Sequence, residues 1–149
     1  MSRKLEITAI SAEELTDGGK PVKKSTFVSF EIAGGRRNQS MSTSLDEVGG
    51  NYPIWSDKLE TEFSTETSKE SFMYVKVFSR NLGKDKHVGT ARVPVKVFTG
   101  EYAPVGFLHC LSYRLWDDYG RRNGLVNFSA KVSPEKSGRF SGERTFWLR

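Results

Sequence analysis

The chain has 149 residues, of which 36% are hydrophobic and 12% aromatic, and its formal net charge is +5. This length and apolar content suit one domain with one buried core and argue against a largely disordered chain. A single cysteine, Cys110, excludes an intrachain disulfide and a zinc site built from thiolates. The positive charge fits contact with an anionic partner, although a solvated surface of mixed charge explains it equally well.

The sequence predicts no segment that crosses a membrane. Its first residues carry charges where a secretory signal peptide has an apolar run, and no stretch approaches the roughly 18 apolar residues of a spanning helix. Ser2 breaks the N-myristoylation pattern, and there is no C-terminal prenylation cysteine. We therefore expect a cytoplasmic protein whose membrane contact is peripheral.

Hydrophobic residues recur with a period of two, which is typical of half-buried β-strands. Leu5, Ile7 and Ala9 alternate with polar residues at the start of the chain. Turn residues separate this strand from seven more, predicted at Ser25–Ile32, Arg37–Thr43, Trp55–Phe63, Phe72–Ser79, Val88–Val93, Gly106–Leu115 and Gly124–Val132. A short helical turn is expected after Pro94. The pattern predicts an all-β fold, an eight-stranded antiparallel β-sandwich.

The end of the chain differs in composition from the rest. Ser, Gly, Glu and Arg dominate after Ser133, and no apolar period continues. We expect residues 1–132 to form the folded domain and residues 133–149 a flexible C-terminal tail.

Strand order predicts which connections lie together. If consecutive strands are antiparallel, Ala12–Lys24, Ser44–Ile54, Arg80–His87 and Trp116–Asn123 emerge at one end of the sandwich. Eight cations fall in these connections: Lys20, Lys23, Lys24, Arg80, Lys84, Lys86, Arg121 and Arg122. Carboxylates accompany them, among them Asp17, Asp46, Glu47, Asp85, Asp117 and Asp118. We expect a rim of mixed charge with a small basic excess.

Several motifs, in their order and spacing, resemble those of C2 domains. Lys4–Glu13 resembles the first strand of that family, and Lys24–Val28 stands where the family usually reads Ser-Asp-Pro-Tyr-Val. Asn51–Asp57 matches the Asn-Pro-x-Trp-Asn-Glu signature with Tyr52 inserted, and Val88–Ala91 resembles the strand after the last calcium loop. The resemblance runs from about Leu5 to Val132 and implies a C2-type β-sandwich.

A narrower resemblance is to the small plant C2-domain proteins that associate with the copine BON, the BON-associated proteins. It is carried by Gly49–Trp55, Leu111–Leu115 and Asn123–Asn127. It implies binding to anionic phospholipid at the plasma membrane, a copine-like C2 protein as partner, and negative regulation of plant defence and cell death. Independently of the resemblance, we expect Trp55 to fold into the sandwich and pin a loop to a strand.

The sequence argues against a calcium site. Calcium needs six to eight oxygen ligands, mostly carboxylates. Where C2 domains that bind the ion carry aspartates, this chain has Ser25, Ser79 and Asn81. Only Asp17 and Asp85 stay as weak candidates for metal ligands, and lysines flank the latter. We predict calcium binding that is absent or weak, and no other cofactor; a calcium-dependent phospholipid-binding domain is the alternative that the resemblance supports.

Without a metal, attraction to a membrane must come from the cations of the protein, each worth about 1 kcal/mol near an anionic leaflet. We expect a lipid-binding surface made of one apolar probe and six cations: Leu82, Lys20, Lys23, Lys24, Arg80, Lys84 and Lys86. A lower-ranked candidate is Arg36-Arg37 with Lys58. A protein adaptor that binds no lipid is a further alternative.

Catalysis finds little support, so no catalytic residue is expected. His109 and Cys110 are neighbours on a predicted strand and face opposite sides of it. His87 is expected in a loop without a serine or cysteine partner. The chain has no nucleophile elbow, no phosphate-binding loop and no metal-spaced histidine cluster.

Nucleic acid is the other rival for a basic β-domain rich in aromatic residues. Stacking on bases needs exposed aromatics interleaved with cations on one face. Here the aromatics mostly occupy expected core positions: Phe27, Trp55, Phe63, Phe72, Phe107 and Phe128. Exposed ones such as Tyr119, beside Arg121-Arg122, are sparse. Nucleic acid is therefore not expected as a partner.

Overall fold

The computed structural model describes residues 2–32, 39–64, 71–99 and 105–133. Over these ranges the strands are β1 (Ser2–Glu13), β2 (Thr16–Asp17), β3 (Lys20–Pro21), β4 (Ser25–Ile32), β5 (Gln39–Ser42), β6 (Ile54–Ser64), β7 (Phe72–Asn81), β8 (Lys84–Pro94), β9 (His109–Trp116) and β10 (Arg122–Val132). A four-residue helix, α1 (Lys96–Thr99), confirms the helical turn predicted after Pro94. The predicted C-terminal tail, 133–149, lies almost wholly outside the described residues.

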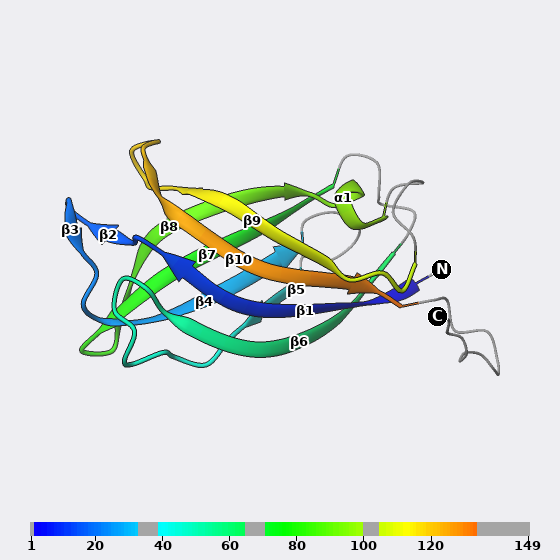
Figure 1. The fold of residues 1–149 in the computed structure, drawn as a ribbon, viewed down its shortest axis with the longest axis horizontal. Coiled ribbons are helices and arrows are strands. Elements are labelled where there is room, and N and C mark those ends of the chain that lie inside the picture. Colours follow the sequence, from blue (N-terminus) through cyan, green and yellow to red (C-terminus); the bar gives the residue numbers. More distant parts are fainter. Residues whose placement is uncertain (1, 33–38, 65–70, 100–104, 134–149) are drawn as a thin grey trace.

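Eight of the strands form an antiparallel sheet in the order β5-β4-β7-β8-β9-β10-β1-β6 (Figure 1). Strands β8 and β9 meet at a single pair, Thr90 with Trp116, so the sheet folds there into two four-stranded layers. The short strands β2 and β3 form a separate hairpin. The predicted eight-stranded antiparallel sandwich is confirmed.

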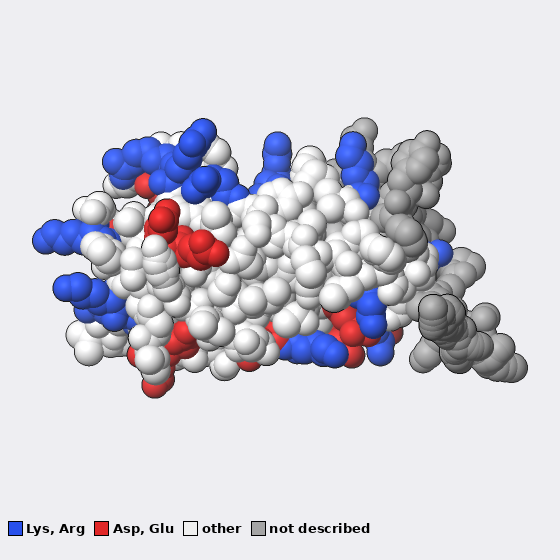
Figure 2. All heavy atoms as spheres, viewed as in Figure 1, with Lys and Arg blue, Asp and Glu red and all other residues white. Residues whose placement is uncertain are grey.

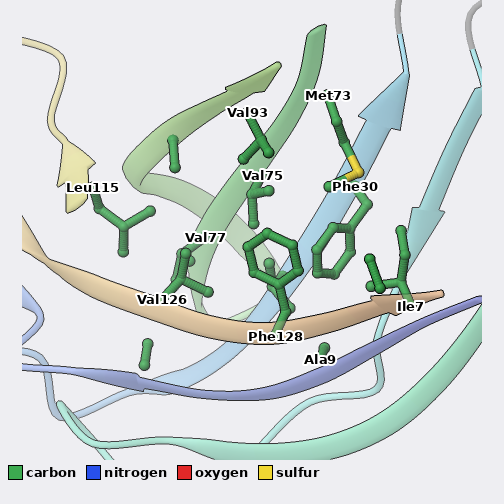
Figure 3. Close-up of a cluster of buried hydrophobic side chains, with 14 of the residues drawn as sticks. Ile7, Ala9, Phe30, Met73, Val75, Val77, Val93, Leu115, Val126 and Phe128 are labelled. Atoms are coloured by element: carbon green, nitrogen blue, oxygen red, sulfur yellow. The ribbon is translucent and has the colours of Figure 1, made fainter. Parts of the chain in front are cut away.

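The core lies between the two layers (Figure 3). Phe30 of β4 meets Phe128 of β10 edge-on, with ring centroids 5.6 Å apart. On β7, Met73, Val75 and Val77 alternate with half-exposed residues and are fully buried. This alternation is the physical reason for the period of two in the sequence, because successive side chains of a strand point to opposite faces.

The first strand follows the same rule until it bulges. Leu5, Ile7 and Ala9 are fully buried, as the alternation predicts. The pairing register then shifts between Ala9 and Ser11, and after this shift Ala12 rather than Ser11 is the next buried residue. Such a bulge bends and twists the strand as it approaches the loops at its end.

Three predictions about aromatic residues differ from the structure. Phe107 is 59% exposed, because β9 begins at His109 and the preceding segment is not a strand. Phe27 and Phe72 are half-buried on the outer face of a layer, where Arg80 and Arg92 cover their rings. The side chain of Phe63 lies outside the described residues, whereas Trp55 and Phe128 are buried as expected.

Candidate functional site

Four connections meet at one end of the sandwich, as the antiparallel strand order predicts (Figure 1). We call them loop 1 (14–24, which contains β2 and β3), loop 2 (43–53), loop 3 (82–83) and loop 4 (117–121), and together the tip. Backbone hydrogen bonds from Ala12 to Pro53 and from Leu15 to Asn51 tie the start of loop 1 to loop 2. Loops 1 and 2 are therefore fixed to each other.

A buried amide, that of Asn123, joins loop 1 to the opposite layer. Its Oδ1 accepts hydrogen bonds from the backbone N (2.8 Å) and the Oγ1 (2.7 Å) of Thr16. Its Nδ2 donates to the carbonyl oxygens of Thr16 (2.9 Å) and Val88 (2.8 Å). Every donor and two acceptor positions of this amide are thus satisfied. The side chain fixes loop 1, β8 and the start of β10 relative to one another.

Loop 2 is organised by the carboxylate of Asp46. Its Oδ1 accepts from the backbone N of Val48 (2.7 Å) and Gly49 (2.8 Å), and its Oδ2 from that of Ile54 (2.6 Å). Partial burial, the largest single effect, raises the pKa of Asp46, but the three backbone donors together outweigh it and the pKa is lowered. A Cβ on Gly49 would lie 2.7 Å from the Cα of Pro53, so the loop closes only around glycine.

Trp55 connects loop 2 to the neighbouring layer. Its indole is buried and its Nε1 donates a hydrogen bond of 3.1 Å to the carbonyl oxygen of Thr26. This contact confirms the structural role expected for Trp55. The structural roles of Asp46, Gly49 and Trp55 account for the motif Gly49–Trp55, and no ligand is needed to explain it.

Loop 3 is much shorter than predicted. Asn81 pairs with Lys84, so only Leu82 and Gly83 lie outside the strands. Both have positive φ, 54° and 77°, as a type I′ hairpin turn requires. Leu82 is 93% exposed, and an apolar residue in this conformation costs about 1 kcal/mol relative to an ordinary one. An exposed leucine that also strains its backbone is a candidate for function rather than for stability.

All six predicted lipid-binding cations are exposed at or beside the tip. Lys20, Lys23 and Lys24 belong to loop 1, with Lys20 on β3. The other three were expected in a loop, but Arg80, Lys84 and Lys86 lie on the ends of β7 and β8, because the hairpin continues almost to its tip. Figure 2 shows Lys and Arg side chains gathered at the end where Figure 1 places β2 and β3.

Two of these cations are paired with the two candidate metal ligands. The guanidinium of Arg80 donates to both oxygens of Asp85, Nε to Oδ1 at 2.7 Å and Nη2 to Oδ2 at 3.3 Å. The Nζ of Lys86 lies 2.6 Å from Oδ1 of Asp17. These hydrogen bonds lower the pKa of Asp85 and raise the pKa of Lys86.

The sequence model of the C2 domain matches residues 3–110. The chain belongs to the C2 domain family. Over 135 residues it is 43% identical to BON1-associated protein 2 of Arabidopsis thaliana, an alignment that covers 89% of this chain. The chain spans 63% of the length of that relative.

Solved structures show the same fold. A single C2 domain of a plant Extended Synaptotagmin 1 superposes with a TM-score of 0.69 at 13% identity, covering 91% of this chain and 97% of that one. A two-domain C2 fragment of Extended-Synaptotagmin 2 gives a TM-score of 0.61 at 17% identity, covering 87% of this chain and 40% of that one. These structures show that the chain has the C2 fold.

The side chains of this C2 domain do not fit a calcium ion. Asp85 and Lys86 are consecutive on β8 and face opposite sides of the hairpin, so the two pairs hold Asp85 and Asp17 on different faces. Ser79 stands at a position where the family carries aspartate, and its side chain is buried. Within the described ranges no three His, Cys, Asp or Glu side chains lie close enough to hold a metal ion.

Of the second predicted lipid surface, the structure describes only Lys58, so the surface stays a prediction. Lys58 lies on β6 and pairs with Glu6 at 3.9 Å. Arg36 and Arg37 lie outside the described residues. The same part of the chain contains no helix that is long and apolar enough to cross a membrane.

The sequence analysis missed three exposed apolar residues of the tip: Val48 (94%), Tyr52 and Ile54 project from loop 2 and its junction with β6. Tyr119 (81%) projects from loop 4 and is exposed, as predicted. The guanidinium of Arg121 lies over the Tyr119 ring, 4.9 Å from its centroid. Large apolar residues inside segments predicted to be solvent-exposed loops were the available signal.

His87 was expected in a loop, but it lies on β8. Its Nδ1 is 2.6 Å from Oδ1 of Asp118 and its Nε2 is 2.6 Å from Oγ1 of Thr90. The ring also packs edge-on against Phe78. These contacts join loop 4 to β8, which is a structural role.

The lowered pKa of Asp46 makes the stability of this C2 domain depend on pH. A carboxylate whose folded-state pKa lies below its unfolded value contributes stability above the unfolded value, about 4, and loses it as the pH falls through the folded value. We expect Asp46→Asn to lower the free energy of unfolding by about 1–2 kcal/mol at pH 7, because an amide N–H then opposes a backbone donor. Urea unfolding from pH 7 to pH 3 should show the two proteins converging; a constant difference would contradict this role.

Proposed function

We propose that this C2 domain is a peripheral membrane-binding module that attaches to anionic phospholipid through its tip without requiring calcium. The observation that carries the proposal is the composition of the tip. Exposed apolar side chains project from loops 2, 3 and 4, and exposed lysines of loop 1 and of β8 surround them. The apolar groups suit the interfacial layer of a bilayer, and the cations suit its negative surface.

The cations of the tip differ in how available they are. Lys20, Lys23, Lys24 and Lys84 have no ion pair with any described residue, whereas Arg80 and Lys86 are paired. Four free lysines near an anionic leaflet, at about 1 kcal/mol each, supply an attraction of roughly 4 kcal/mol. That attraction weakens as salt rises, because exposed charges are screened.

The salt dependence and the loop 1 lysines can be tested together by vesicle flotation in a chelating buffer. We expect binding to phosphatidylserine vesicles and not to neutral phosphatidylcholine vesicles, with affinity falling as salt rises. Changing Lys20, Lys23 and Lys24 to Gln should weaken binding at least tenfold.

The matched control changes Lys4, Lys96 and Lys131 to Gln, which removes the same charge away from the tip. Its affinity should fall less than threefold. Equal losses in the two triple variants would show that net charge, rather than the tip, controls binding.

Leu82 offers a test of the apolar contact. Asn is favoured at the first central position of a type I′ turn, so Leu82→Asn should keep or raise stability, by up to about 1 kcal/mol. The same change should weaken vesicle binding several-fold because it removes the exposed side chain. Thermal unfolding and flotation of the same sample separate the two effects; unchanged binding would remove Leu82 from the membrane contact.

We also propose a copine-like C2 protein as partner and a negative regulatory role in plant defence and cell death. This proposal is supported by the 43% identity to a protein named as BON1-associated. Binding of a purified copine in the absence of vesicles, together with indifference to anionic vesicles, would favour a protein adaptor instead.

A further inference from the structure

A groove of roughly 530 Å³ lies between loop 1, β8 and loop 4. This volume suits a small ligand or a lipid headgroup. Its charged lining consists of Asp17, Lys86, His87, Asp117, Asp118, Arg121 and Arg122. The buried amide of Asn123 forms part of the wall, so the groove is held in shape by the contact that joins loop 1 to β8.

Two of the carboxylates in the groove are committed to the structure of loop 4. Asp117 accepts hydrogen bonds of 2.9 Å from the backbone N of Tyr119 and of Arg121. Asp118 is bound to His87 at 2.6 Å. Asp117 therefore holds the turn of loop 4 together, and Asp118 already has a partner in His87 of β8.

Two guanidinium groups of the groove keep donors available. Arg121 lies over Tyr119, and only its Nε contacts Asp117, at 3.3 Å. Arg122 is exposed and forms no ion pair with any described residue. Both side chains can turn their terminal nitrogens toward an anion, and guanidinium groups bind phosphate oxygens in pairs.

The ion pair between Lys86 and Asp17 differs from the contacts of Asp117 because it is exposed and can exchange with other ions. It joins two segments 69 residues apart in the sequence, and its side chains are 66% and 40% exposed. Exposed ion pairs contribute little to stability and exchange readily with other ions. Asp17 accepts no other hydrogen bond from any described residue, so an incoming anion can replace it at Lys86.

We propose that this groove binds a phosphomonoester of a polyphosphoinositide headgroup, and that Asp17 is an internal competitor which the phosphomonoester displaces from Lys86. The proposal rests on the membrane binding proposed above, and it adds the chemical class of the headgroup. Lys86, Arg121 and Arg122 are the groups that bind the phosphate.

The competitor explains why the ligand should be a phosphomonoester. The phosphate of a phosphodiester lipid such as phosphatidylserine carries one negative charge, the same as the carboxylate of Asp17. Replacing Asp17 with such a phosphate at Lys86 therefore gains little free energy. A phosphomonoester carries a charge of about −1.5 to −2 and three acceptor oxygens. It can therefore hold Lys86 and a guanidinium group at once, and the exchange becomes favourable.

Flotation on two vesicle types tests the proposal in a chelating buffer. One type contains phosphatidylserine and the other contains phosphatidylinositol 4,5-bisphosphate, both in phosphatidylcholine and at equal total charge. We expect the native protein to prefer the second type at least fivefold. Asp17→Asn frees Lys86 and should raise the affinity for phosphatidylserine vesicles about fivefold. The gain in affinity for the phosphoinositide vesicles should be smaller, so the preference of the protein for phosphoinositide should shrink.

Three further measurements make the outcome decisive. Glu62→Gln is the control for Asp17→Asn, because it removes one exposed carboxylate far from the tip. Glu62 lies eight residues, roughly 26 Å along β6, from Ile54 at the tip end of that strand. This change should alter the affinity for neither vesicle type by more than twofold. Lys86→Gln should abolish the preference while leaving thermal stability unchanged. Soluble inositol 1,4,5-trisphosphate should compete with the phosphoinositide vesicles, which assigns recognition to the phosphate groups rather than to the bilayer.

The possible failures are distinguishable. If the native protein binds neither vesicle, the proposed membrane function is wrong, and this inference fails with it. If it binds both equally and Asp17→Asn weakens binding or leaves it unchanged, membrane binding stands but the headgroup groove is wrong. Failure of the soluble trisphosphate to compete also overturns the groove.

Discussion

The hydrogen bonds of the buried Asn123 amide are the constraint on which the shape of the tip depends. Loop 1 contains the two-stranded hairpin β2–β3, which is too short to be stable alone. Asn123 binds Thr16 and Val88, and so attaches this hairpin to β8 and β10. Because the amide is buried, leaving its donors unsatisfied would cost about 1–3 kcal/mol. The hairpin, the groove beside it and the lysines it carries all depend on this contact.

The architecture could be predicted from the sequence because the sandwich is built on a strict alternation. Buried residues such as Leu5, Ile7 and Ala9 repeat with a period of two, and the turns between strands contain glycine or asparagine. The antiparallel order then places alternate connections at one end by geometry alone. The burial of Trp55 could also be predicted from the sequence, because a large aromatic side chain after Pro53 at the edge of a strand packs most favourably in the core.

The details of the tip could not be predicted, for identifiable reasons. The Leu82–Gly83 turn lacks the Asn-Gly or Asp-Gly pair typical of a type I′ hairpin, so β7 and β8 were predicted too short. The pairs Lys86–Asp17 and His87–Asp118 join residues 69 and 31 positions apart, which no local pattern reveals. Phe107 looked like a core residue because its sequence neighbourhood is apolar, but the strand begins two residues later.

The charged side chains of the tip decide how it could bind an anionic surface. Asp17 and Asp85, the two candidate metal ligands, are instead paired with Lys86 and Arg80, while the loop 1 lysines form no ion pair with any residue that the structure describes. In the proposed membrane contact, the attraction to anionic lipid comes from these lysines rather than from a bound metal. The most direct test is the affinity for phosphatidylserine vesicles measured in a chelator and again in a calcium titration up to the millimolar range. The account predicts binding in the chelator and no gain with calcium; binding that appears only when calcium is added would contradict it.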